Sequence, residues 1–137
     1  MSRASKLAAV RRSILVKAPR EAVFATISEP EKLRQWYFDD ADVDFRVGGT
    51  LSFSGMEGTV RATITAIEAP SLVVMDYSPP WWGTVTWQFE ALSPASTRVH
   101  LLHKGFEGRE DWIDRFAWGW ESFLKSLKAV AEGRTPK

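Results

Sequence analysis

The stretch DRFAWGWESFLKSLKAV, residues 114–130, decides the fold of this chain. Its large apolar side chains recur at spacings of three and four residues, which is the pattern of an amphipathic helix. Lysines near its end suit the helix dipole, and Gly133 is a natural stop. Extended upstream, the pattern predicts one long helix from about Arg109 to Glu132 with a single apolar face. That face carries Trp112, Phe116, Trp120, Phe123, Leu124 and Leu127.

Gly119 interrupts this helix between two tryptophans, although glycine costs a helix about 1 kcal/mol relative to alanine. It lies three residues after Phe116 and four before Phe123, on the apolar face. We expect Gly119 to permit tight packing against a strand or a neighbouring tryptophan. The alternative is that the missing side chain leaves space for a ligand between helix and sheet.

Trp118 points roughly 200° away from Phe116 and is expected to be partly exposed or to cover a rim.

Upstream of the helix, from residue 41 to about residue 104, apolar residues recur at every second position, which is typical of strands. Short turns join the segments, so the sheet is predicted to be antiparallel with one apolar face. In the strand after Pro70, both faces are apolar, so the period alone does not decide whether Val73, Met75 and Tyr77 point inward. The other inward sets are predicted as Val43, Phe45 and Val47; Leu51 and Phe53; Val60, Ala62, Ile64 and Ala66; Val85, Trp87 and Phe89; and Val99, Leu101 and His103.

A first strand is predicted over residues 10–18, followed by two short helices opened by Pro19 and Pro30. The second of these helices presents Leu33, Trp36 and Tyr37 on one face. The predicted fold class is therefore α+β: a curved antiparallel sheet of six or seven strands wrapped around a long C-terminal helix.

The composition favours one soluble, cytoplasmic domain over residues 1–137, with an ordered core at about residues 10–132. The chain has 137 residues, 45% of them hydrophobic, and a net charge of +1, so the charge points to no nucleic acid. No apolar run reaches the roughly 20 residues of a membrane span. The basic first residues suit a frayed tail better than a transit peptide. Without cysteine, the chain has no disulfide or thiolate chemistry.

The polar residues predict neither a metal site nor a cofactor. His100 and His103 lie three apart on a strand and therefore point to opposite faces. Clustered aspartates at 39, 40, 42 and 44 favour a solvated loop over a cation site. His103 is expected to be a buried, hydrogen-bonded core residue, with a polar anchor or proton-transfer group inside a cavity as the alternative.

The loop SPPWWG, residues 78–83, places Trp81 and Trp82 after two prolines. We expect these tryptophans to cap one end of the core. The alternatives are a gate at the mouth of a cavity or, together with Trp118, a contact in a homodimer.

Five stretches carry a resemblance to a known family: VKAPREAVFATISEPEKLRQWY, DFRVGGTLSF, GTVRATITAIEAP, TRVHLLHKGF and WGWESFLKSL. Together they run from about Val10 to Val130. They resemble the family named for the activator of the heat-shock-protein-90 ATPase (AHSA-type), within the START and birch-pollen-allergen-like (SRPBCC) helix-grip superfamily. The superfamily includes ligand carriers, receptors, cyclases and chaperone cofactors, so the resemblance implies a cavity rather than a reaction. A role in stress response is expected, but the eukaryotic co-chaperone has an additional N-terminal domain that this sequence lacks, which leaves a chaperone partner unsupported.

The leading hypothesis is a binding module with an internal apolar cavity for a hydrophobic small molecule, either lipid-like or aromatic. The alternatives are a cyclase- or hydratase-type enzyme using His103, which the shortage of other inward polar groups disfavours, and a co-chaperone-like interaction domain. The residues predicted to bind the ligand in one pocket are Trp36, Phe45, Leu51, Phe53, Ile64, Met75, Tyr77, Trp87, Phe89, His103, Phe116, Gly119, Trp120 and Phe123.

Overall fold

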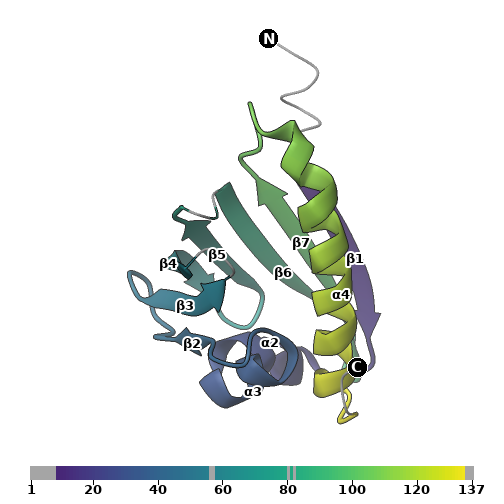
Figure 1. Cartoon of the computed structure of the whole chain (residues 1–137). Coiled ribbons are helices and arrows are strands. Elements are labelled where there is room, and N and C mark those ends of the chain that lie inside the picture. The colour runs from purple at the N-terminus through teal and green to yellow at the C-terminus, as the bar shows by residue number, and fades with distance from the viewer. Residues whose placement is uncertain (1–8, 56–57, 80, 82, 135–137) are drawn as a thin grey trace.

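The computed structural model describes residues 9–55, 58–79, 81 and 83–134. Seven antiparallel strands form one sheet in the order β1-β7-β6-β5-β4-β3-β2, and a long helix, α4, lies across one face (Figure 1). This confirms the predicted α+β helix-grip fold. The strands are β1 (Ala9–Val16), β2 (Asp42–Val43), β3 (Thr50–Gly55), β4 (Gly58–Glu68), β5 (Leu72–Tyr77), β6 (Gly83–Ser93) and β7 (Ser96–Lys104). The helices are α2 (Arg20–Ser28), α3 (Pro30–Trp36), the short 3₁₀ helix η1 (Glu110–Trp112) and α4 (Ile113–Ala131).

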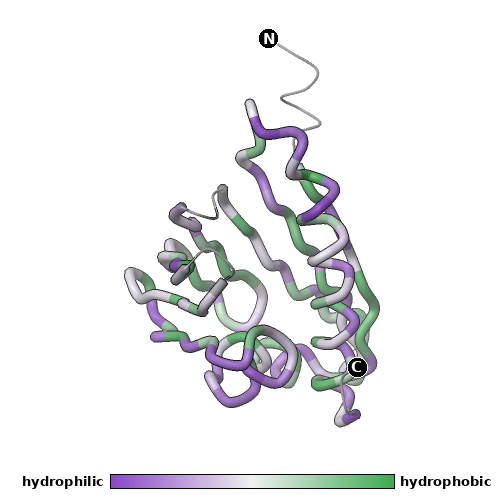
Figure 2. The backbone as a smooth tube through the Cα atoms, viewed as in Figure 1, coloured by the Kyte–Doolittle hydropathy of each residue, from purple (hydrophilic) through white to green (hydrophobic). Residues whose placement is uncertain are grey.

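The inner face of the sheet follows the period-two pattern of the sequence. Val85, Trp87 and Phe89 of β6 are buried, and so are Val99, Leu101 and His103 of β7. On β5, Val73, Met75 and Tyr77 point inward, which settles the strand whose two faces were both apolar. Hydrophobic and hydrophilic residues interleave along these strands and along α4 (Figure 2). One apolar sheet face therefore packs against the apolar face of the helix.

Two positions predicted to face inward lie elsewhere, because β2 ends at Val43. The chain then turns: the Asp44 N–H donates to the Thr50 carbonyl, and the Gly49 N–H donates to the Arg46 carbonyl. Val47 is consequently 59% exposed. Phe45 is half-buried beyond the end of β2 and packs edge-on against Phe24, with 5.4 Å between the ring centroids.

A bulge in β4 changes the alternation near its end. The pairing with β5 shifts between Ile64 and Ala66, so the strand contains an extra residue there. Ile64 is buried as predicted, but Ala66 is only half-buried, and Ile67 packs against the core instead. A period-two pattern cannot reveal such an insertion, because both residues around it are apolar.

The two short helices begin as their prolines predict. Pro30 is the first residue of α3, while Pro19 stands one position earlier than expected, as the N-cap of α2. The indole N–H of Trp36 donates to the carbonyl of Thr26 at 2.7 Å, which fixes α3 on α2. Both helices pack against α4. They lie toward the C-terminal end of α4, where they cover that end of the sheet (Figure 1).

The C-terminal helical segment agrees with its predicted range to within one residue at each end, with η1 as its first turn. Its inner face buries Phe116, Trp120, Leu124 and Leu127, whereas Trp118 is 75% exposed. The predicted contrast between the two neighbouring tryptophans is thus confirmed.

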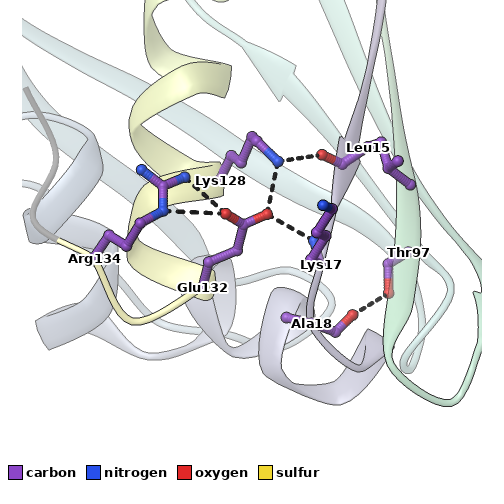
Figure 3. Close-up of polar contacts among 7 residues, drawn as sticks. All are labelled: Leu15, Lys17, Ala18, Thr97, Lys128, Glu132 and Arg134. Carbon is purple, nitrogen blue, oxygen red and sulfur yellow. Dashed lines mark hydrogen bonds and ion pairs between the residues drawn. The ribbon is translucent and has the colours of Figure 1, made fainter.

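A polar cluster fastens the end of α4 to the end of β1 (Figure 3). The carboxylate of Glu132 accepts hydrogen bonds from Lys128 Nζ at 2.7 Å, the Lys17 backbone N–H at 2.7 Å and Arg134 Nη2 at 2.7 Å. Lys128 Nζ also donates to the Leu15 carbonyl at 2.8 Å. Burial alone would raise the pKa of Glu132. The hydrogen bonds from Lys128, the Lys17 backbone and Arg134 outweigh this effect and lower the pKa to about 2.

We expect Glu132→Gln to lower the free energy of unfolding by about 1–2 kcal/mol at neutral pH. The folded-state pKa lies below the ordinary value of 4.5, so the stabilisation exists above pH 4.5 and is lost as the pH falls toward 2. Urea unfolding of both proteins should therefore show a difference that shrinks on acidification. The control is Glu121→Gln, which removes a more exposed ion pair with Arg12 and should cost less than about 0.5 kcal/mol. Equal losses in the two variants would contradict the prediction.

Candidate functional site

A pocket with a volume of about 180 Å³ lies between α4 and the loop that joins β5 to β6. Helix α4 and η1 supply six of its lining residues and the loop supplies one. The lining consists of Trp81, Trp112, Arg115, Phe116, Gly119, Trp120 and Phe123. It is therefore aromatic on most sides, with one glycine and one cation.

The helical period explains why these residues meet. Residues 112, 116, 119 and 123 are spaced by three or four along the chain, so they line one side of the helix. Trp81 reaches this side from the loop, with its ring 4.9 Å from that of Phe116 and 6.3 Å from that of Trp120 between centroids. Both contacts are edge-to-face, the arrangement that aromatic quadrupoles favour.

Gly119 borders open space, contrary to the expectation of tight packing. A Cβ atom added to it would meet no atom within 4 Å, apart from the adjoining residues and the helix backbone. The alternative interpretation, that the missing side chain leaves room beside the helix, agrees with the structure. A Gly119→Ala substitution therefore meets no steric obstacle.

Arg115 is the one charged residue among those that line the pocket. It is exposed, and its guanidinium carbon lies 4.7 Å from the centroid of the Trp112 ring, a cation–π contact. Arg115 and Trp112 are not among the site residues predicted from the sequence. Their spacing gave a usable signal, because Arg115 stands three residues after Trp112 and four before Gly119.

The interior between the sheet and α4 is packed. The void found there among the described residues measures about 10 Å³, which is at most room for one water molecule. Tyr37 and Tyr77 face each other beside it, with 3.2 Å between their hydroxyl oxygens. Burial raises the pKa of Tyr77 to about 12 and that of Tyr37 well above its ordinary value, so both hydroxyls stay protonated.

The residues predicted to border one pocket are divided in the structure between this pocket, the small inner void and the core. Phe116, Gly119, Trp120 and Phe123 line the 180 Å³ pocket. Trp36, Leu51, Met75, Tyr77, Trp87 and again Trp120 border the small inner void. Phe53, Ile64, Phe89 and His103 are buried in the core, and Phe45 packs against its margin. Trp82 and the N-terminal residues 1–8, for which a tail was expected, lie outside the described residues.

His103 is fully buried, in agreement with its expected place in the core. The indole N–H of Trp120 donates to its Nδ1 at 3.0 Å, so a neutral imidazole carries its proton on Nε2. Trp120 lines the pocket, whereas His103 does not. His103 therefore acts as the polar partner of a pocket tryptophan, and the structure gives no support to proton transfer by its ring.

His100 lies on the opposite, outer face of the sheet, as predicted. Its Nδ1 is 2.9 Å from the hydroxyl of Ser13, and its Nε2 is 2.9 Å from a carboxylate oxygen of Glu90. Ser13, His100 and Glu90 thus link β1, β7 and β6 by side-chain hydrogen bonds. Ser13 and His100 also line a groove of about 400 Å³ on this face. Sequence reasoning missed this network, because the register of three strands decides which polar side chains meet. Ser13 and Glu90 are exposed and His100 is half-buried, which suits a cross-strand network on the solvent face.

Comparison with known proteins identifies a family that matches most of the chain. Residues 17–132 match the model of the family described as "Activator of Hsp90 ATPase homolog 1-like protein". A search of curated proteins found no match. Among the described residues, no helix is long and apolar enough to cross a membrane.

Solved structures similar to this chain include proteins from three organisms. The Aha1 dimer from Colwellia psychrerythraea is 22% identical, with a TM-score of 0.82 over 90% of this chain and 96% of that one. Protein SSP2350 from Staphylococcus saprophyticus is 26% identical, with a TM-score of 0.78 over 94% and 96%. PFC0360w, an HSP90 activator from Plasmodium falciparum, is 22% identical, with a TM-score of 0.74 over 89% and 94%.

Proposed function

The chain belongs to the Activator of Hsp90 ATPase homolog 1-like family, and from this premise we propose that it binds a small, flat hydrophobic molecule. The binding site is the aromatic pocket between α4 and the β5–β6 loop. The observation that carries this proposal is the open space beside Gly119, because a helix glycine surrounded by large aromatic side chains otherwise costs stability without any gain in packing.

The size of the pocket favours an aromatic ligand over a lipid. An apolar cavity of about 150 Å³ is known to accept benzene. A pocket of about 180 Å³ therefore suits a molecule with one ring and a short substituent. The interior void of about 10 Å³ offers no continuation for an acyl chain. Of the two ligand classes predicted from the sequence, the aromatic one fits this space.

A second candidate function is a protein contact through Trp118. This side chain is 75% exposed on α4, and large exposed aromatic residues are enriched at protein interfaces. The printed descriptions of two similar structures name a dimer and an HSP90 activator. A homodimer is the simpler of these partners, and the mass of the protein in solution tests it. The enzyme alternative has no comparable observation, because His103 is fully buried and does not line the pocket.

Binding of toluene tests the pocket directly, with titration followed by NMR chemical shifts of the tryptophan indole N–H groups. Toluene is expected to shift Trp120 and to bind the unmodified protein. In Gly119→Leu, the new side chain occupies the open space, so the affinity should fall at least about tenfold. The thermal midpoint should stay the same or rise, because leucine is the better helix former by nearly 1 kcal/mol.

The matched control is Ser122→Leu, which adds the same side chain to an exposed position of the same helix. It should leave toluene binding unchanged. If toluene fails to bind the unmodified protein, or if both leucine variants bind it equally well, the proposed site is wrong.

A further inference from the structure

We propose that the natural ligand is an aromatic carboxylate, and that Arg115 binds its carboxylate group while the aromatic residues hold its ring. This inference rests on the proposed function and names the ligand class for the same pocket. Two observations carry it: the position of the Arg115 guanidinium at the pocket, and the absence of a competing ion pair.

The guanidinium of Arg115 is held in place by an aromatic ring. Its central carbon lies 4.7 Å from the centroid of Trp112, and both residues line the pocket. Stacking on a ring engages the flat face of a guanidinium but leaves the N–H groups along its edge available to an acceptor. A carboxylate matches that edge with two parallel hydrogen bonds.

Arg115 makes no ion pair within the part of the chain that the structure describes. The usual helical partner would be Asp111, which stands four residues earlier, and Asp114 is its direct neighbour. Neither carboxylate pairs with it; the guanidinium lies over Trp112 instead. The positive charge at the pocket is therefore not neutralised by a side chain in the described structure.

The other six lining residues restrict what can accompany the anionic group. They offer indole and phenyl rings and the open space at Gly119, so the remainder of the ligand must be apolar and flat. Arg115 also lies in the first turn of α4, where the helix dipole adds a weak positive potential. An aromatic ring that carries one carboxylate on a short arm satisfies both parts of the site.

The test compares phenylacetate with phenylacetamide, which has the same shape without the charge, by isothermal titration calorimetry. The unmodified protein is expected to bind phenylacetate about tenfold more tightly, since a charge-assisted bidentate pair is roughly twice as strong as a neutral hydrogen bond. Arg115→Gln should abolish this preference while changing the affinity for phenylacetamide less than about twofold. The matched control is Lys125→Gln, which removes one positive charge from an exposed position of α4 outside the pocket.

The outcomes separate the two proposals. Equal affinities of the unmodified protein for the two probes would overturn the carboxylate inference, while toluene binding would still support the pocket. An equal loss of preference in Lys125→Gln would also overturn it, because the effect would then come from net charge rather than from Arg115. Failure of toluene to bind would overturn the pocket itself.

Discussion

Trp120→Ala is expected to lower the free energy of unfolding by about 3–5 kcal/mol, the usual cost of removing a buried tryptophan. Trp120 is 2% exposed and donates its indole N–H to His103 at 3.0 Å. Its ring contacts Trp87 edge-on, with 5.6 Å between centroids, and stacks with Tyr37 at 6.2 Å. The substitution thus creates a cavity between helix and sheet and leaves Nδ1 of a buried histidine without the donor that it accepts from.

Chemical denaturation of Trp120→Ala beside Trp118→Ala checks this expectation. The control removes the same side chain two residues earlier in the same helix, where it is 75% exposed, and should change the free energy of unfolding by no more than about 0.5 kcal/mol. Trp120→Phe retains most of the ring volume and isolates the loss of the hydrogen bond, at about 1–3 kcal/mol. Comparable losses at positions 118 and 120 would show that burial does not distinguish the two tryptophans.

The contrast between these tryptophans could be predicted from the sequence, because it follows from periodicity alone. A helix of 3.6 residues per turn separates positions 118 and 120 by about 200°. The same kind of argument placed Trp87 and His103 on the inner faces of their strands, with a period of two. Periodicity is sufficient to predict which side chains face inward wherever a helix or strand has one apolar face and no inserted residue.

The position of the pocket could not be predicted in this way, because it depends on contacts between residues far apart in the chain. Trp81, which precedes β6, packs against Phe116 of α4, although the two residues are 35 positions apart in the chain. Whether Gly119 is crowded depends on that same approach, so the sequence left both interpretations open and favoured the wrong one. The predicted position of Phe45 differs from the structure for another reason. Its strand ends at Val43, and the turn that follows places the Phe45 ring against Phe24.

The second large effect is expected at Gly83, the first residue of β6, immediately after the loop that carries Trp81. Its φ angle is +94°, in the region that residues with a side chain rarely adopt. A Cβ added there would overlap the backbone carbonyl oxygen of Lys104 and come within 3.1 Å of His103 Nε2. Gly105 explains the closeness, because a Cβ on that residue would lie 2.7 Å from the Cα of Gly83. The two glycines therefore allow the start of β6 to approach the end of β7.

Gly83→Ala is accordingly expected to cost about 3–5 kcal/mol, from backbone strain and from the displacement of the neighbouring strand. The matched control is Gly48→Ala, where φ is +86° but an added Cβ would meet no atom within 4 Å. That variant carries only the backbone strain and should lose about 1–2 kcal/mol. Urea denaturation gives both values, and similar losses would show that the approach of Lys104 has no steric consequence. Because Gly83 anchors the loop of Trp81 beside His103, its displacement should also weaken toluene binding, whereas Gly48→Ala should leave that affinity unchanged.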